Sequence, residues 1–166
     1  MDASDEALLR AFVGPRNEAY YLAYFARADA RGYAPISWHW PALCFGMLWL
    51  VYRRLYPWAL ALFAAPYVAM LVAAAAEHWM PGSGAPVQWT LVLGLLGVWL
   101  PLNANAIYYR YARGAVAAAR LLHPGNVAAQ TALLSSRGGV RPQLPLVLLG
   151  VMLMLMLLAG PPPAGP

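Results

Sequence analysis

Residues 57–76 decide the fold, and they read Pro57-Trp-Ala-Leu-Ala-Leu-Phe-Ala-Ala-Pro-Tyr-Val-Ala-Met-Leu-Val-Ala-Ala-Ala-Ala76. None of these 20 residues is charged, and about 20 consecutive apolar residues are what an α-helix needs to cross a bilayer. A second uncharged stretch, of 23 residues, covers positions 87–109. The sequence therefore predicts two transmembrane helices, at 57–76 and 87–109, joined by a short loop rich in glycine and proline.

Composition places the chain in the same class. Charged residues make up 10% of its 166 residues and hydrophobic residues 62%, whereas a soluble domain carries roughly 25% charged residues. So few charges could not cover the surface of a soluble fold, and the long apolar runs suit lipid. We therefore expect an all-α integral membrane protein. All 11 basic residues are arginines, which together with abundant Ala, Gly and Pro indicates a bacterial genome rich in GC.

Two shorter apolar runs flank these spans. Residues 38–52 form a run of about 15 residues, which is too short to cross a bilayer and ends at Arg53 and Arg54. We expect this run to be re-entrant or interfacial. Residues 144–159 form a run of 16 residues, mostly Leu, Met and Val. We expect a third transmembrane helix there, in a C-terminal segment 144–166, with a re-entrant dip as the alternative.

The other segments are expected in the cytoplasm. Residues 1–37 most resemble soluble protein, and an amphipathic helix within them carries an aromatic stripe. The stripe consists of Tyr20, Tyr21, Tyr24, Phe25 and Ala28. Such a face either lies in the headgroup region or packs against the chain's own membrane helices. The predicted membrane domain covers residues 38–122, with the second long helix continuing to Leu122. Residues 123–143 are expected as a cytoplasmic connection that is polar and partly loose over 127–143.

The distribution of arginines gives the expected orientation. Residues 77–86, between the two long spans, carry no arginine, whereas residues 108–143 carry five and no acidic residue. Because basic residues stay on the cytoplasmic side, the first loop is expected outside and the second inside. If residues 38–52 do not cross, every arginine lies on that one side. We therefore expect a multi-pass protein of the bacterial inner membrane with a cytoplasmic N-terminus.

An aromatic group surrounds Arg53 and Arg54 in the sequence. Its members are Trp38, Trp40, Trp49, Tyr52, Tyr56 and Trp58. One interpretation is an interfacial aromatic belt with an arginine anchor. The other is a site in which the arginines bind a lipid headgroup or another anionic ligand. Anionic lipid headgroups also explain the net charge of +5, so we expect membrane lipids and not nucleic acid as partners.

Polar residues gather at the cytoplasmic end of the second span. They are Asn103, Asn105, Tyr108 and Tyr109. Asparagines there either bond a neighbouring helix or line a path for a substrate or ion. Apart from tyrosines, neither long span contains an ionisable residue, which argues against a proton-coupled pump. The candidate lipid- or partner-binding residues are Trp38, Trp40, Trp49, Arg53, Arg54, Asn103, Asn105, Tyr108 and Tyr109.

The sequence contains no recognisable constellation for catalysis or for a cofactor. Glu77 and His78 would supply only two ligands of a metal site. Ser83, Ser135 and Ser136 lack the sequence context of an activated nucleophile. We therefore expect a non-enzymatic protein without a cofactor or a metal.

Four stretches in this order carry a family resemblance. They are Phe12-Val-Gly-Pro-Arg-Asn-Glu-Ala-Tyr-Tyr-Leu, Ser37-Trp-His-Trp-Pro-Ala, Phe45-Gly-Met-Leu-Trp-Leu-Val-Tyr-Arg-Arg-Leu-Tyr and Asn103-Ala-Asn-Ala-Ile-Tyr-Tyr-Arg-Tyr. Over residues 12–113 the chain resembles the domain-of-unknown-function family 2628, which implies a small bacterial inner-membrane protein and supplies no catalytic residues. Two residues depart from the family pattern, because His39 replaces an Asn between the tryptophans and Met47 replaces a Pro after Gly46.

Two functions remain open from the sequence. The first is a non-enzymatic accessory or regulatory subunit that binds a membrane protein partner or a second copy of itself. The alternative is a protein that binds or transports a lipid or small solute through the group between Trp38 and Trp58.

Overall fold

The computed structural model describes residues 3–159, and all regular structure within that range is helical. Residues 1–2 and the tail at 160–166, which belongs to the predicted C-terminal segment, lie outside the described residues. The elements are α1 (Ala3–Val13), α2 (Glu18–Arg31), α3 (Trp40–Phe45), α4 (Met47–Tyr52), α5 (Tyr56–Trp79), α6 (Gly84–Leu93), the π-helical turn η1 (Gly94–Trp99), α7 (Leu100–Leu122), α8 (Val127–Arg137) and α9 (Gln143–Ala159).

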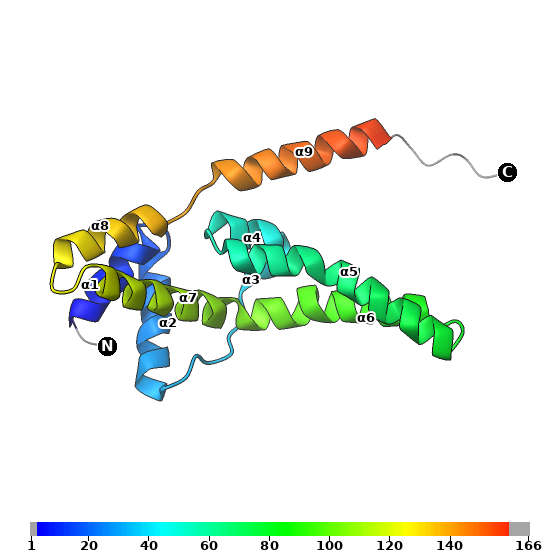
Figure 1. Cartoon of the computed structure of the whole chain (residues 1–166), viewed down its shortest axis with the longest axis horizontal. Coiled ribbons are helices and arrows are strands. Elements are labelled where there is room, and N and C mark those ends of the chain that lie inside the picture. The colour runs from blue at the N-terminus through cyan, green and yellow to red at the C-terminus, as the bar shows by residue number, and fades with distance from the viewer. Residues whose placement is uncertain (1–2, 160–166) are drawn as a thin grey trace.

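Two long antiparallel helices form a hairpin that extends from one end of the molecule (Figure 1). The first, α5, has 24 residues and is therefore about 36 Å long. The second runs without a break through α6, η1 and α7, from Gly84 to Leu122. Both helices are long and apolar enough to cross a membrane. The prediction of an all-helical chain with two such helices is confirmed for the described residues.

A network of backbone bonds closes the tip of the hairpin. The Glu77 carboxylate accepts hydrogen bonds from the backbone N–H groups of Gly82, at 2.8 Å, and Gly84, at 2.7 Å. A side chain at position 84 would collide with Glu77, because an added Cβ would lie 2.9 Å from its Oε2. Glu77, in the last turn of α5, thus stabilises the turn between the two apolar helices.

The other end of the molecule is a base of four packed segments: α1, α2, α8 and the second half of α7 (Figure 1). In α2 the residues Tyr21, Tyr24, Phe25 and Ala28 are buried, and the Phe25 ring lies 5.8 Å from the Tyr108 ring of α7. Most of the aromatic stripe therefore packs against the chain's own long helix. Tyr20 is the exception, because 45% of it is exposed.

The connection at residues 123–143, predicted to be polar and partly loose over 127–143, contains the helix α8 at Val127–Arg137, which the sequence did not predict. Asn126 caps this helix, with its side-chain oxygen accepting from the Ala129 N–H at 3.0 Å. Leu134 is buried, and Gln130 donates to the His123 carbonyl at 2.7 Å. Packing of α8 on α1 stabilises a helix of 11 residues, which is too short to be stable alone in water.

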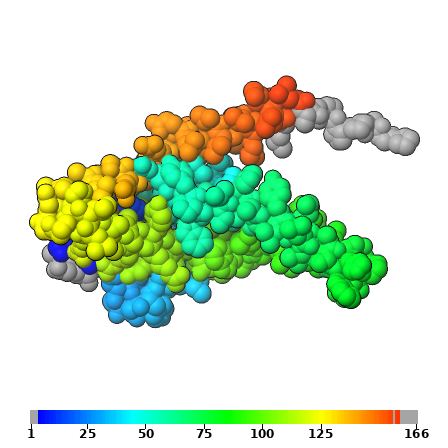
Figure 2. All heavy atoms as spheres, viewed as in Figure 1, coloured from blue at the N-terminus to red at the C-terminus, as the bar shows by residue number. Residues whose placement is uncertain are grey.

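The run at 38–52 forms two short helices, α3 and α4, which lie beside α5 and α7. Gly46 separates them with φ 47° and ψ −117°, a conformation that favours glycine. Met47 begins α4, and the first position of a helix also accepts the proline of the family pattern. The last helix, α9, starts against α4 and then extends in the same general direction as the hairpin (Figures 1 and 2).

Candidate functional site

The turn after α4 gives Arg53 and Arg54 different partners. Arg53 ends the helix, and its N–H donates to the Trp49 carbonyl at 3.0 Å. Arg54 follows with φ 62°, a left-handed conformation that costs a non-glycine residue roughly 1–2 kcal/mol. The Leu55 N–H then returns to the Leu50 carbonyl at 2.8 Å. This strained turn places the first arginine inside the fold and the second at the contact with α8.

Arg53 is buried, with 1% of its surface exposed, and aromatic rings surround its charge. Its guanidinium carbon lies 4.3 Å from the centre of the Tyr21 ring and 5.2 Å from that of Tyr108. One nitrogen, Nη2, donates to the Arg16 carbonyl at 3.1 Å. Among the described residues no carboxylate lies within 4 Å of this guanidinium. Ring faces and one carbonyl therefore hold the charge.

His39 uses both ring nitrogens beside this arginine. Its Nδ1 accepts from the Ala42 N–H at 3.1 Å, which caps α3. Because Nδ1 is an acceptor, the ring proton lies on Nε2, which faces the Tyr21 hydroxyl at 3.2 Å. Burial, together with the positive charge of Arg53, lowers the pKa of His39 to about 4. The ring is therefore neutral at physiological pH.

Asn105 joins α7 to the segment that precedes α3. Its Nδ2 donates to the Tyr20 hydroxyl at 2.7 Å and to the Ser37 Oγ at 2.8 Å. The backbone agrees, because the Ser37 N–H donates to the Leu102 carbonyl at 3.2 Å. Asn103 instead donates to the Trp99 carbonyl of its own chain segment at 2.8 Å. Of the two asparagines, Asn105 makes the contact between neighbouring segments that one interpretation of the sequence expects.

Arg54 connects the turn to the end of α8. Its Nη1 donates to the Ser136 carbonyl at 2.6 Å and to the Gly138 carbonyl at 2.8 Å. Gly138 in turn lies against α1, where a Cβ at that position would come within 2.0 Å of the Phe12 carbonyl oxygen. Arg54 therefore acts as a bridge between the turn after α4 and the base.

A second charge cluster joins the N-terminal helices to α7. Arg113 donates to Asp5 at 2.6 Å and to Asp29 at 2.7 Å, and Arg120 also pairs with Asp5. The Tyr109 hydroxyl donates to Asp29 at 2.5 Å. The bond from Arg113 lowers the pKa of Asp5 below its ordinary value. No local sequence pattern indicates these pairs, because each joins residues from distant parts of the chain.

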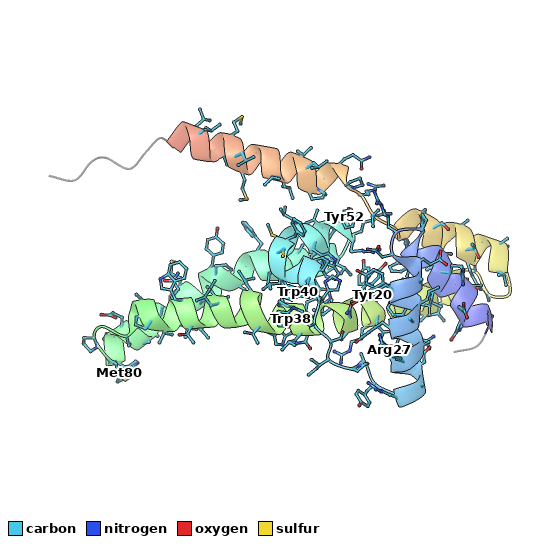
Figure 3. The ribbon with its side chains drawn as sticks, turned by 180° about the vertical axis from the view of Figure 1, so that it is seen from behind. Tyr20, Arg27, Trp38, Trp40, Tyr52 and Met80 are labelled. Carbon is cyan, nitrogen blue, oxygen red and sulfur yellow. The ribbon has the colours of Figure 1, made fainter. Side chains whose placement is uncertain are left out.

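The structure brings together only part of the predicted residue set. Arg53 and Tyr108 meet, and Trp49 lies next to them, with its ring 4.6 Å from that of His39. Trp38 and Trp40 form a separate pair, with ring centres 5.6 Å apart and 42% and 66% of their surfaces exposed (Figure 3). The rings within 6 Å of the Arg53 guanidinium belong to Tyr21, Tyr52 and Tyr108.

No sequence pattern connects Tyr21 with Arg53. The aromatic stripe of residues 20–28 predicts a buried helix face, but it does not indicate which residues that face contacts. Within the described residues no group of three His, Cys, Asp or Glu side chains could hold a metal ion. Arg53 and the rings of Tyr21, Tyr52 and Tyr108 form a cluster that holds α2, α4 and α7 together.

Comparison with known proteins gives one match. A family model described as "Protein of unknown function (DUF2628)" matches residues 18–113. That range contains Arg53 and the rings of Tyr21, Tyr52 and Tyr108, whereas Arg16, α8 and α9 lie outside it. No curated protein and no solved structure matches the chain.

Proposed function

The chain belongs to this family of proteins of unknown function, whose model matches more than half of its length. We propose that it is an accessory or regulatory subunit of a protein complex in a bacterial inner membrane. It binds a protein partner on its cytoplasmic base and has no catalytic chemistry of its own. The support comes from three features: the uncovered apolar hairpin, the committed polar core and an apolar corner on the base.

The uncovered faces of the long helices support the placement in a membrane. Large side chains along the hairpin point outward, and 69% of Leu60, 53% of Phe63 and 67% of Leu71 are exposed. Exposing this apolar surface to water has a large free-energy cost, whereas contact with lipid does not. The arginines lie in α1, α2, α7 and α8 or in the turns and connections next to the base, and Glu77 is the charged residue at the hairpin tip. This distribution of charge supports a cytoplasmic location for the base.

The interior polar groups support a role without catalysis. His39 has a partner on each ring nitrogen, and the Arg53 charge faces rings and a carbonyl inside the packed core. A general acid or base must reach a substrate proton, and these side chains are enclosed by the helices that they join. Their contacts hold a rigid platform.

The observation that carries the partner is an apolar corner where α7 meets α8. Leu121, Leu122 and Val127 lie there, with 83%, 57% and 59% of their surfaces exposed. This corner is at the end of the molecule opposite the hairpin tip (Figure 1), so in the proposed orientation lipid does not cover it. Contiguous apolar residues left in water on a well-packed base mark a protein-binding surface.

Site-specific photocrosslinking in native membranes tests this proposal. A photoreactive residue at position 121 is expected to give a discrete adduct of higher mass, and one at Arg31, exposed elsewhere on the base, is the matched control. An adduct of twice the protein's mass identifies a second copy as the partner. Absence of an adduct from both 121 and 127 would refute the partner-binding role.

Cysteine labelling tests the membrane placement independently. In a Cys44→Ala background, Met80→Cys at the hairpin tip is expected to react with a membrane-impermeant thiol reagent in intact cells. Ser4→Cys on α1 is expected to react only after permeabilisation. Labelling of Ser4→Cys in intact cells would overturn the orientation.

A further inference from the structure

Two hollows have walls that are neighbours in the sequence at residues 140–142, between the base and α9. One is a cleft of about 740 Å³ on the base side, lined in part by Val140 and Arg141. The other is an open groove of about 340 Å³ between α3–α4 and α9, lined in part by Tyr52 and Pro142. The Arg141 N–H donates to the Tyr52 carbonyl at 3.0 Å, which fixes the junction of the two.

The cleft has an excess of positive charge. Its walls carry four arginines, Arg10, Arg16, Arg54 and Arg141, and one acidic residue, Glu18. Arg10 is neutralised by ion pairs of 2.9 Å to Glu6 and 2.6 Å to Glu18. Within the described part of the chain no carboxylate lies within 4 Å of the other three guanidinium groups. The Arg54 Nε is buried there and has no hydrogen-bond partner.

The groove is apolar on both sides. Phe45, Leu48 and Trp49 form one wall, and Pro145, Leu146 and Leu149 form the other. It lies beside the start of α9, at Pro145, Leu146 and Leu149, and α9 extends from there in the same general direction as the hairpin (Figure 1). In the proposed orientation the cleft therefore lies at the cytoplasmic headgroup level, and the groove leads into the hydrocarbon.

We propose that the cleft and groove together bind one anionic phospholipid of the inner leaflet. Arg16 and Arg141 contact its phosphate, Arg54 holds the rim, and one acyl chain lies in the groove against α4 and α9. Arginine matches phosphate geometry with paired donors. A free phosphate would leave the apolar groove empty, and an uncharged amphiphile would leave the arginines without a counter-charge. Both hollows are satisfied by an anionic head joined to an apolar chain.

This site overlaps in part with the one that the sequence predicted between Trp38 and Trp58, because Trp49, Tyr52 and Arg54 line it. Trp38 and Trp40 do not line it, and Arg53 is buried. The proposal rests on the membrane placement above, which cysteine labelling tests separately from lipid binding. It does not depend on the apolar corner of the base, so failure of the partner-binding role would leave it intact.

Native mass spectrometry of the full chain in mild detergent, titrated with phosphatidylglycerol, measures this binding directly. One retained phosphatidylglycerol per chain is expected, with phosphatidylcholine retained much more weakly. The double variant Arg16→Gln/Arg141→Gln should weaken phosphatidylglycerol binding roughly 30-fold, because each arginine near a lipid surface contributes about 1 kcal/mol. The matched control Arg31→Gln/Arg110→Gln removes the same charge from exposed positions outside the cleft and should change little.

The groove has its own variant pair. Leu146→Trp fills the groove and is expected to weaken binding of phosphatidylglycerol, whereas Leu153→Trp, on an exposed part of α9 outside the groove, is not. Thermal unfolding of each variant without lipid checks that the fold persists. Equal retention of both lipids, equal loss in the control pair, or full competition by inorganic phosphate would overturn the proposal.

Discussion

Replacing Arg53 tests how the base is joined to the hairpin. The side chain is fully enclosed, donates one hydrogen bond to Arg16 and lies against the rings of Tyr21 and Tyr108. Arg53→Ala removes its volume and its charge together, whereas Arg53→Met removes the charge and keeps most of the volume. The two variants therefore separate the contribution of packing from that of electrostatics.

The expected magnitudes follow from these contacts. Truncation of a large buried side chain costs about 3–5 kcal/mol, and Arg53→Ala also leaves the Arg16 carbonyl without its donor, so we expect a loss of about 4 kcal/mol. Arg53→Met loses the two closer cation–π contacts, to Tyr21 and Tyr108, of about 1 kcal/mol each. It also loses a charged hydrogen bond of about 2 kcal/mol. The several kcal/mol otherwise needed to bury the charge offset that loss. We expect Arg53→Met to be within about 1.5 kcal/mol of the wild type.

Unfolding in mild detergent, followed by tryptophan fluorescence, measures both variants, with the exposed Arg31→Ala as control. Equal, large losses for Arg53→Ala and Arg53→Met would mean that the charge dominates and would refute the packing argument. No loss for either would mean that Arg53 lies at the surface, as the anchor interpretation of the sequence expects.

Five further substitutions have defined outcomes. His39 has a folded pKa of about 4 against an ordinary value of 6.5, so its contribution to stability is complete above pH 6.5 and is lost as the pH falls towards 4. The loss is on the order of 2–3 kcal/mol, and His39→Asn should keep the cap of α3 but abolish this dependence in unfolding measured across that range. Tyr108→Phe removes a buried hydroxyl that has no partner and should leave the free energy of unfolding unchanged or raise it. Tyr21→Phe loses the contact with His39 and should lower it by about 1 kcal/mol. Gly138→Ala should lower the melting temperature and expose α1 and α8 to proteolysis, because its Cβ would overlap the Phe12 carbonyl. Gly114→Ala, with open space around its Cβ in the middle of α7, should raise the melting temperature.

The parts of the fold that the sequence predicts are those with strong local signals. The uncharged run at 57–76 and the run at 87–109 correspond to α5 and to the continuous helix from Gly84, because an apolar run of that length has few other solutions. Gly32 ends α2 with φ 72°, as its position after a periodic segment indicates. The helix at 127–137 was missed because its stability comes from contact with α1, which no local pattern records.

The Arg53-Arg54 pair shows why the site was harder to predict than the fold. An arginine that follows an apolar run looks the same in sequence whether it anchors the chain at a membrane surface or turns into a core. The difference depends on one backbone conformation, φ 62° at Arg54, in the turn where the two side chains find different partners. It depends also on Tyr21 and Tyr108, which reach Arg53 from α2 and α7. A buried charge needs such partners from elsewhere in the chain, so the same dipeptide becomes a core residue only once α2 has packed on α7. The burial of Arg53 is therefore a property of the assembled base, and its neighbour Arg54 stays at the rim, where the proposed phospholipid site lies.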